Sequence, residues 1–223
     1  MKKAMTATLL GVALFAGMGA GVYAGSNLQE IKAYLNSGLK FKVDGTPVQL
    51  QNASGAAVVP ITYNNTVYLP VRAVSDALDI AVDYDAATGT IQLGEKSEGV
   101  SISSGFDSMY HTKDPDKTIY NGKDYKEVYF DNADGNRSSS FMLYPKGRYQ
   151  KLYLQVAAIG KDVEGLFVKD SDSDIELKAT TLDVADGLAT VEVDIGGVDS
   201  LYVYADVEDG GSMFVPLTTS YYK

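Results

Sequence analysis

The feature that most constrains this chain is the run of short, strand-like segments that fills its second half. After residue 99 no stretch shows the 3.6-residue apolar period of a helix, and turn sequences such as DGN (134–136), PKG (145–147) and DGG (209–211) recur. Many short strands at nearly regular spacing predict a β-sandwich or jelly roll for residues 100–223. The predicted strands are residues 100–103, 128–130, 139–144, 152–158, 166–169, 174–182, 188–195, 201–207 and 213–222.

The segment from 66 to 94 has a mixed pattern. Pro70 suits the first turn of a helix, and Val71, Val74 and Leu78 give that helix one apolar face. The segments at 81–85 and 90–93 then form strand patterns around a Thr-Gly turn, as paired strands do. We expect strand, helix and hairpin in that order.

Two further patterns precede this segment. An Asp-Gly turn at 44–45 joins two short strand patterns, 39–43 and 47–50, and predicts a hairpin. Residues 26–35 show helical spacing and predict a short helix or arm, and residues 57–63 predict a strand. The polar sequence GEKSEG (94–99) predicts a linker at 95–99, so a small α+β domain is expected over residues 25–94 and the β-sandwich over 100–223.

The segments YLPVR (68–72), VDYD (82–85) and TIQL (90–93), with the short helix between the first two, resemble the stalk domain of extracellular bacterial proteins. This family is also called copper amine oxidase N-terminal-like. The resemblance covers about residues 28–93. It implies a small α+β module that serves as a spacer or contact domain, and it implies no catalytic site.

The N-terminus has the pattern of a secretory signal. Lys2 and Lys3 precede an apolar run, and Val22-Tyr23-Ala24 places small residues before a cut at Gly25. The alternative is an uncleaved membrane anchor. We expect residues 1–24 to be a signal peptide and the protein to be secreted and associated with the cell envelope.

The net charge and the cysteine content restrict the classes of partner and the means of stabilisation that we expect. The formal net charge of −10 argues against nucleic acid as a partner, because phosphate backbones repel an acidic surface. The chain contains no cysteine, so core packing without disulfides must hold this exported protein together.

The segments YKEVYF (125–130), SFMLYPKGRYQKL (140–152) and VAAIG (156–160) look like the novel putative carbohydrate-binding module family. That resemblance spans about residues 99–223. It implies a jelly-roll sandwich and contact with glycans.

Metal chemistry is restricted by the ligand count. Copper sites use imidazoles, and His111 is the single histidine of the sequence, so no copper is expected. Asp170, Asp172 and Asp174 form the start of an oxygen-ligand loop and are the calcium candidate, although Ile175 and Thr181 replace the residues that an EF-hand needs. The alternative is an acidic hairpin loop.

Aromatic residues interleaved with basic ones provide the binding candidates, since sugar rings stack on aromatic faces. The alternative is that about half of these tyrosines belong to the core. The candidate ligand-binding residues are Tyr110, His111, Tyr120, Tyr125, Tyr129, Arg148 and Tyr149, with Tyr144 in the same cluster.

No catalytic constellation appears in the sequence, so no enzyme is expected. The first hypothesis is an exported, non-catalytic protein whose stalk domain presents a β-sandwich that binds cell-wall or extracellular polysaccharide. One alternative is a structural protein of the envelope or matrix that self-associates through strand edges. The other is a glycan hydrolase with two facing carboxylates.

Overall fold

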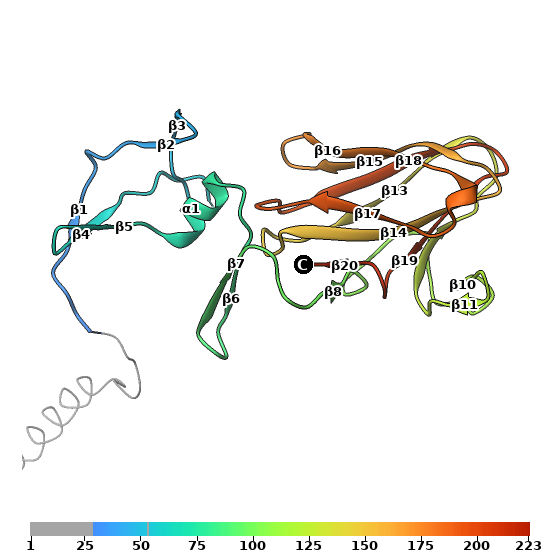
Figure 1. Cartoon of the computed structure of the whole chain (residues 1–223), viewed down its shortest axis with the longest axis horizontal. Coiled ribbons are helices and arrows are strands. Elements are labelled where there is room, and N and C mark those ends of the chain that lie inside the picture. The colour runs from blue at the N-terminus through green and yellow to red at the C-terminus, as the bar shows by residue number, and fades with distance from the viewer. Residues whose placement is uncertain (1–28, 53) are drawn as a thin grey trace, which may run out of the picture.

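The computed structural model describes residues 29–52 and 54–223, and the signal predicted for residues 1–24 lies outside them. The described chain forms a small N-terminal part with one short helix, followed by a β-sandwich (Figure 1). The predicted fold class, mainly β with a small α+β N-terminal part and a C-terminal β-sandwich, is confirmed. Within the described ranges, no helix is long and apolar enough to cross a membrane.

The strands of the N-terminal part pair into three small antiparallel sheets. These are β1-β4-β5, the hairpin β2-β3 and the hairpin β6-β7. The elements are β1 (Tyr34–Leu35), β2 (Phe41–Val43), β3 (Thr46–Val48), β4 (Ile61–Tyr63), β5 (Thr66–Tyr68), α1 (Val71–Ala77), β6 (Val82–Asp85) and β7 (Thr90–Leu93).

Helix α1 begins directly after Pro70, whose φ of −59° suits a helix entry. It ends at Leu78, and Asp79 then adopts a left-handed φ of 52°, which turns the chain out of the helix. The N–H of Ile80 donates to the carbonyl of Ser75 at 2.9 Å, so the last turn keeps a bonded carbonyl. The chain then runs straight into β6.

Two local expectations need correction. Within the described residues of the predicted helix or arm, Tyr34 and Leu35 form β1, which pairs with Thr62 and Ile61. The free edge of β4 accepts a third strand there, and this long-range pairing overrides the helical spacing. The strand predicted at 57–63 is shorter, because regular pairing starts only after Pro60, which has no N–H to donate.

The larger sheet of the sandwich has seven strands in the order β8-β20-β14-β19-β12-β9, with β17 also paired to β14. Strand β14 is the central strand of this sheet and pairs with three other strands. Its first half lies between β17 and β20, and its last residues pair with β19. The strands are β8 (Val100–Ser101), β9 (His111–Thr112), β12 (Val128–Asp131), β14 (Lys151–Ile159), β17 (Ala189–Asp194), β19 (Ser212–Pro216) and β20 (Tyr221–Tyr222).

The second sheet has four strands in the order β13-β18-β15-β16. The two sheets enclose the main core, to which alternate residues of the long strands contribute, for example Leu152 and Leu154 of β14 and Val203 of β18. These strands are β13 (Arg137–Leu143), β15 (Val163–Asp170), β16 (Glu176–Leu182) and β18 (Leu201–Val207), and the remaining elements are β10 (Ile119–Tyr120), β11 (Lys123–Asp124) and the 3₁₀ turn η1 (Val184–Asp186).

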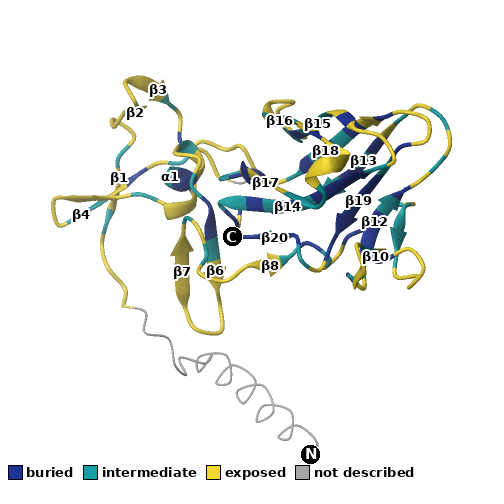
Figure 2. Cartoon of the chain, turned by 45° about the vertical axis from the view of Figure 1, so that its right-hand side comes forward, coloured by how far each residue is buried: buried dark blue, intermediate teal, exposed yellow. Residues whose placement is uncertain are grey.

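Burial differs sharply between the two parts, as Figure 2 shows by colour. The strands of the sandwich are largely buried along their inner faces, whereas the N-terminal part is mostly exposed. Within residues 29–52 and 54–99, the buried apolar side chains are Leu50, Pro60, Ala73, Ala81 and Val82. The N-terminal part therefore has almost no core of its own.

A compact junction joins the N-terminal part to the sandwich. The N–H of Val82 donates to the Gly147 carbonyl at 3.0 Å, and the N–H of Ala81 donates to Gln150 Oε1 at 3.0 Å. Gln150 Nε2 in turn donates to the Asp79 carbonyl at 3.2 Å. Because the bonds come from consecutive backbone groups, residues 79–82 are fixed against the loop between β13 and β14.

Candidate functional site

The most defined hollow on the sandwich lies at the end where β13 passes into β14. This end cleft has a volume of about 490 Å³. That size lies within the range of small-ligand sites. Its floor is apolar and includes Ile102, Phe106, Leu143 and Tyr222, and its rim contains Tyr144, Lys146, Arg148 and Ser104.

The rim is built by alternation. Leu143, Pro145, Gly147 and Tyr149 are buried, while the intervening residues 144, 146 and 148 are exposed. Tyr144 is 57% exposed, so most of its ring faces solvent. All three exposed residues line the cleft, so the segment presents one aromatic ring and two cationic side chains to it.

The turn that holds this rim is fixed by backbone bonds. Lys146 and Gly147 both adopt left-handed φ values, 56° and 62°, and glycine does so without a Cβ penalty. The Lys146 N–H donates to the Asp199 carbonyl at 3.0 Å, and the Gly147 N–H donates to the Val198 carbonyl at 2.8 Å. The rim is therefore preorganised.

Beside the cleft, charged groups are arranged around Tyr149, which lines it, and Asp83, which does not. One side of the Tyr149 ring stacks on Tyr222 with centroids 4.8 Å apart, and Lys96 Nζ lies 4.4 Å from its centroid. Arg148 Nε donates to Asp83 Oδ1 at 2.7 Å. This bond, helped by the Lys96 ammonium, holds the pKa of Asp83 far below its usual range, and the same bond raises the pKa of Arg148.

The cleft is cationic and aromatic but contains no carboxylate. Among the residues that line it there is no Asp, Glu or His. Hydrolysis of a glycosidic bond by the usual route needs two carboxyl groups on either side of the bond. Acidic residues such as Glu164, Asp206 and Glu208 instead line shallow hollows at the opposite end of β13, and Glu208 pairs there with Lys161 at 3.2 Å.

Of the seven predicted ligand residues, Arg148 and Tyr149 line this cleft. Tyr149 is buried between Tyr222 and Lys96, so it forms a wall and offers no free face. Lys146 and the loop at 100–106 belong to the cleft and were missed by sequence reasoning. The alternation over residues 143–149 was the signal that could have found Lys146.

Two predicted residues belong to the core. Tyr129 is fully buried, and its hydroxyl lies 2.7 Å from Ser139 Oγ. Tyr125 is buried against Phe214, edge to face at 5.8 Å. A sugar cannot stack on a buried ring, so the structure corrects both predictions in favour of the core alternative.

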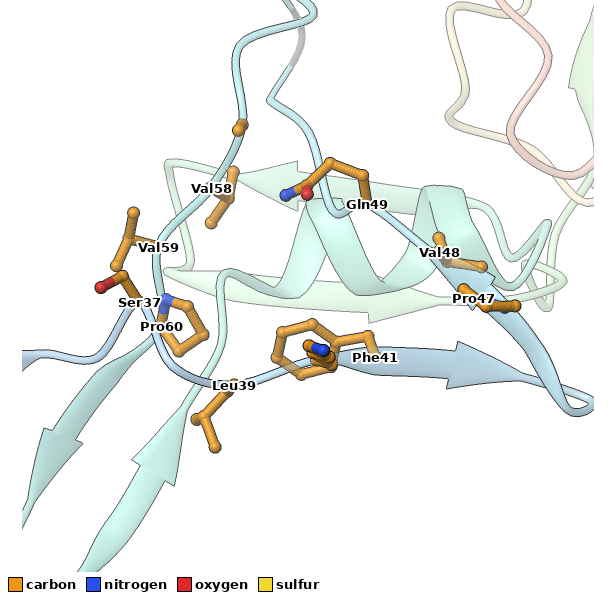
Figure 3. A pocket seen from close by; sticks show the side chains of 11 residues that line it. Ser37, Leu39, Phe41, Pro47, Val48, Gln49, Val58, Val59 and Pro60 are labelled. Carbon is orange, nitrogen blue, oxygen red and sulfur yellow. The ribbon is translucent and has the colours of Figure 1, made fainter.

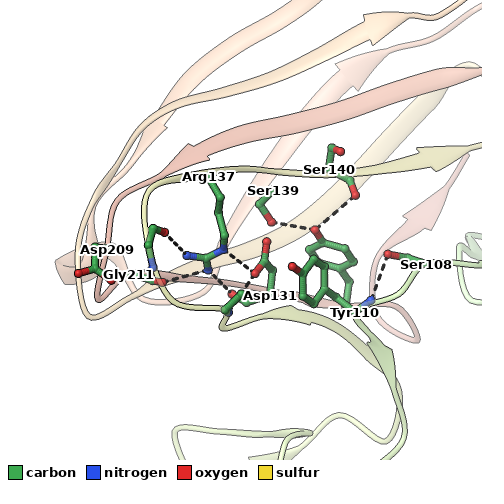
Figure 4. A network of polar contacts seen from close by, with 11 residues as sticks. Ser108, Tyr110, Asp131, Arg137, Ser139, Ser140, Asp209 and Gly211 are labelled. Atoms are coloured by element: carbon green, nitrogen blue, oxygen red, sulfur yellow. Dashed lines mark hydrogen bonds and ion pairs between the residues drawn. The ribbon is translucent and has the colours of Figure 1, made fainter.

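The remaining three lie elsewhere: His111 is in β9, Tyr110 directly precedes it, and Tyr120 is in β10 of the separate β10-β11 hairpin. Tyr110 packs edge-on against Tyr129 with centroids 5.8 Å apart, beside the buried ion pair of Asp131 and Arg137 (Figure 4). His111 Nε2 lies 2.8 Å from Glu127 Oε1. Tyr120 stacks on Phe214 at 5.3 Å. Each therefore has a partner within the protein, and none lines the end cleft.

The calcium candidate is also corrected. Asp170 accepts bonds from the Asp172 N–H and the Ser173 hydroxyl, Asp172 accepts one from Ser200, and Asp174 lies 3.4 Å from Lys169 Nζ. Each of the three carboxylates has its own protein partner, and the three do not converge on one point. Throughout the described residues, no three acidic, histidine or cysteine side chains gather as a metal site would require.

A second aromatic group, not predicted, lies on the outer face of the four-stranded sheet. Phe167, Tyr204 and Tyr202 stack in a row with centroid distances of 4.9 and 5.2 Å. Their faces largely cover one another, which leaves less ring surface for a ligand than the single exposed ring of Tyr144. The end cleft is therefore the better candidate.

Fold and cleft together define a two-part β-rich protein with an open, cationic and aromatic cleft beside the junction. Residues 42–119 match the family model of the copper amine oxidase N-terminal domain, so this stretch is similar to that domain. The match confirms the resemblance predicted for the first part of the chain and continues past residue 93 to the start of β10. A search among curated proteins found no match. The residues do not fit a copper centre, because the single histidine is engaged with Glu127.

Proposed function

We propose that this is an exported, non-catalytic cell-envelope protein that binds cell-wall or extracellular polysaccharide through the end cleft. The observation that carries the proposal is the combination of the exposed Tyr144 ring with Lys146 and Arg148 on one preorganised rim. A sugar ring stacks on such an aromatic face while its hydroxyls bond to neighbouring polar groups.

The charge of the rim favours an acidic sugar. The chain as a whole is acidic, yet Lys146 and Arg148 line the cleft and no acid does; Arg148 is already paired with Asp83 outside the lining, so Lys146 supplies the unpaired positive charge. Lys146 forms none of the ion pairs present among the described residues, so its ammonium is available to a ligand carboxylate or phosphate. Polysaccharides that contain such groups are expected to bind more tightly than neutral ones.

Three further points support the proposal. The cleft lacks the paired carboxylates of a hydrolase. The N-terminal sequence has the pattern of a secretory signal. The second half of the sequence resembles a carbohydrate-binding module, and residues 42–119, which we propose to include the stalk, are similar to the copper amine oxidase N-terminal domain.

The test is retention of the mature protein on insoluble peptidoglycan and on a panel of acidic and neutral polysaccharides. Tyr144→Ala and Lys146→Ala are each expected to weaken binding by about tenfold, which corresponds to loss of one stacking or charge-assisted contact. The matched control is Tyr34→Ala, which removes an equally exposed tyrosine from β1. Retention on no polysaccharide, or equal binding by Tyr144→Ala and Tyr34→Ala, would contradict the proposal.

A further inference from the structure

Two residues of the N-terminal part hold the wall of the end cleft from outside it. Asp83 of β6 accepts two hydrogen bonds from the Arg148 guanidinium, from Nε at 2.7 Å and from Nη2 at 3.2 Å. Lys96 Nζ lies 4.4 Å from the centroid of the Tyr149 ring and 2.7 Å from Asp83 Oδ2. Of these four residues, Arg148 and Tyr149 line the cleft. Two cleft-lining side chains are therefore supported by residues that do not line it.

The backbone of the rim is bound from the same side. The Val82 N–H donates to the Gly147 carbonyl at 3.0 Å, directly before Asp83 and Arg148 in the sequence. The turn itself is already fixed by its bonds to the carbonyls of residues 198 and 199. What the N-terminal part adds is therefore the direction of the Arg148 side chain.

The other large hollow of the described chain lies away from these contacts. It is an apolar groove of about 500 Å³ between the hairpin β2-β3 and the segment 57–60 (Figure 3). Its described lining includes Phe41, Val48 and Pro60, with Lys40 as its cation, and no residue of β6 or of the segment 94–99. The bonds of β6 to the sandwich thus lie beside the end cleft and not beside the groove.

The bonds to Asp83 orient Arg148 without using all of its donors. Nε and Nη2 each donate to the carboxylate, and no described residue accepts a hydrogen bond from Nη1. The side chain of Arg148 also remains 47% exposed. The five N–H groups of a guanidinium lie in one plane, so fixing two of them fixes the directions of the rest. The remaining donors are available to a ligand in the cleft.

Asp83 leaves the surrounding charge positive. Arg148 and Lys96 share its one carboxylate, so the three groups together have one net positive charge. The bond from Arg148, helped by Lys96, lowers the pKa of Asp83 and keeps it ionised. Lys146 on the same rim adds a further positive charge. An anionic group of a ligand is therefore attracted to this wall of the cleft.

We propose that Asp83 is a positioning residue of the end cleft, which holds the Arg148 guanidinium so that its remaining N–H groups donate to a carboxylate or phosphate of the bound polysaccharide. This inference rests on the proposed function and deepens it. The N-terminal part then does more than carry the sandwich, because it completes the site that selects acidic sugars.

Orientation is expected to outweigh repulsion between Asp83 and the ligand anion. A partly exposed charge pair changes affinity by less than about fivefold. A free arginine loses side-chain freedom on binding, which weakens binding by about ten- to thirtyfold, and the bonds to Asp83 remove most of that loss before the ligand arrives. The net contribution of Asp83 to the affinity is therefore favourable, by about fivefold.

The test measures binding of the full mature chain to polygalacturonate, a carboxylate polymer, and to dextran, a neutral one. Arg148→Ala should weaken binding to polygalacturonate by about tenfold and Asp83→Ala by about fivefold. Binding to dextran should be weaker and equal in all three proteins, whereas a general loss of structure would lower both affinities. Gln150→Ala is the matched control, because it removes junction bonds to Ala81 and Asp79 without lining the cleft, and it should leave both affinities unchanged.

A double-mutant cycle separates positioning from a general structural effect. If Asp83 acts through Arg148, adding Asp83→Ala to Arg148→Ala costs no further affinity for polygalacturonate. A further fivefold loss in the double variant overturns the inference, because Asp83 would then support the cleft by another route.

The outcomes also distinguish this inference from the proposed function. Equal or tighter binding of polygalacturonate by Asp83→Ala overturns the inference alone, since Asp83 would then be neutral or would compete with the ligand for Arg148. Wild-type binding to dextran without binding to polygalacturonate has the same consequence. A wild-type chain that binds neither these polymers nor peptidoglycan overturns the inference and the proposed function together.

Discussion

Arg148 binds Asp83 across the junction with two hydrogen bonds, Nε to Oδ1 at 2.7 Å and Nη2 to Oδ2 at 3.2 Å. Lys96 Nζ lies 2.7 Å from the same Oδ2, so two cations share one carboxylate. Arg148 is also part of the rim of the end cleft. One residue thus belongs both to the rim of the end cleft and to the attachment of the N-terminal part.

The junction should be pH-dependent. The Arg148 and Lys96 bonds lower the pKa of Asp83, so its stabilising effect is complete above its unfolded pKa of about 4 and is lost as the pH falls toward its lower folded value. Asp83→Asn should reduce stability at pH 7 by about 1 kcal/mol and flatten the acid side of the profile. Thermal unfolding at pH 7 and pH 3 measures both effects. Asp134→Asn, an exposed turn residue, is the control, and equal profiles for the two variants would contradict the assignment.

The junction is expected to require glycine at position 196, because the Asp79 backbone and the Gln150 side chain pack directly against it. A Cβ there would overlap the Asp79 carbonyl oxygen and the Gln150 side-chain amide. Gly196→Ala should therefore either destabilise the protein by about 1–3 kcal/mol or detach the N-terminal part. Limited proteolysis between residues 94 and 99 would detect detachment. Gly38→Ala, where the nearest atom is an Asn side chain at 3.5 Å, should change neither property.

The buried ion pair of Asp131 and Arg137 should be sensitive to loss of one partner. Asp131 is fully buried, Arg137 Nε lies 2.7 Å from its Oδ1, and Oδ2 has no hydrogen-bond partner among the described residues. Arg137→Met is expected to lower the free energy of unfolding by about 3–5 kcal/mol, because it leaves an uncompensated buried charge. Asp131→Asn combined with Arg137→Met should recover part of that loss in urea denaturation. A double variant no more stable than Arg137→Met would argue against the charge as the cause.

The hydroxyl of Tyr129 should contribute to stability through its contacts with Ser139 and the Ser140 carbonyl. Tyr129→Phe keeps the ring but leaves Ser139 Oγ buried without that partner, at an expected cost of about 1–3 kcal/mol. Adding Ser139→Ala should recover much of this loss, because both buried polar groups are then removed. Chemical denaturation of the two single variants and the double variant completes a double-mutant cycle. If the changes in the free energy of unfolding are strictly additive, the two groups do not interact.

Sequence signals that depend on a few neighbouring residues predicted the helix, strands and turns in which those residues lie. Pro70 placed the start of α1, the alternation at 81–85 predicted β6 with one extra residue at its start, and the segment at 90–93 reproduced β7. The turn at Lys146-Gly147 was likewise foreseen as a break between strands. These features depend on backbone preferences over a few residues, which the sequence displays without reference to the rest of the fold.

The site was harder to predict because it depends on distant parts of the chain. Tyr129 and Tyr144 look alike in the sequence, and both lie in or beside strands. Only the pairing of β12 and the position of β13 decide that the first is buried and the second is exposed. The helix or arm predicted at 26–35 was wrong at Tyr34 and Leu35 for the same reason, because the strand that pairs with β1 is almost thirty residues away in the sequence.

The junction also determines how a pulling force would travel through the molecule. Residues 79–83 are bonded to residues 147–150, which lead directly into β14, the strand with neighbours along both edges. Tension applied to the N-terminal part therefore reaches the larger sheet by two routes, the covalent link to β8 and the junction bonds next to β14. A molecule anchored at one end and bound to a polymer at the other would resist extension at that point.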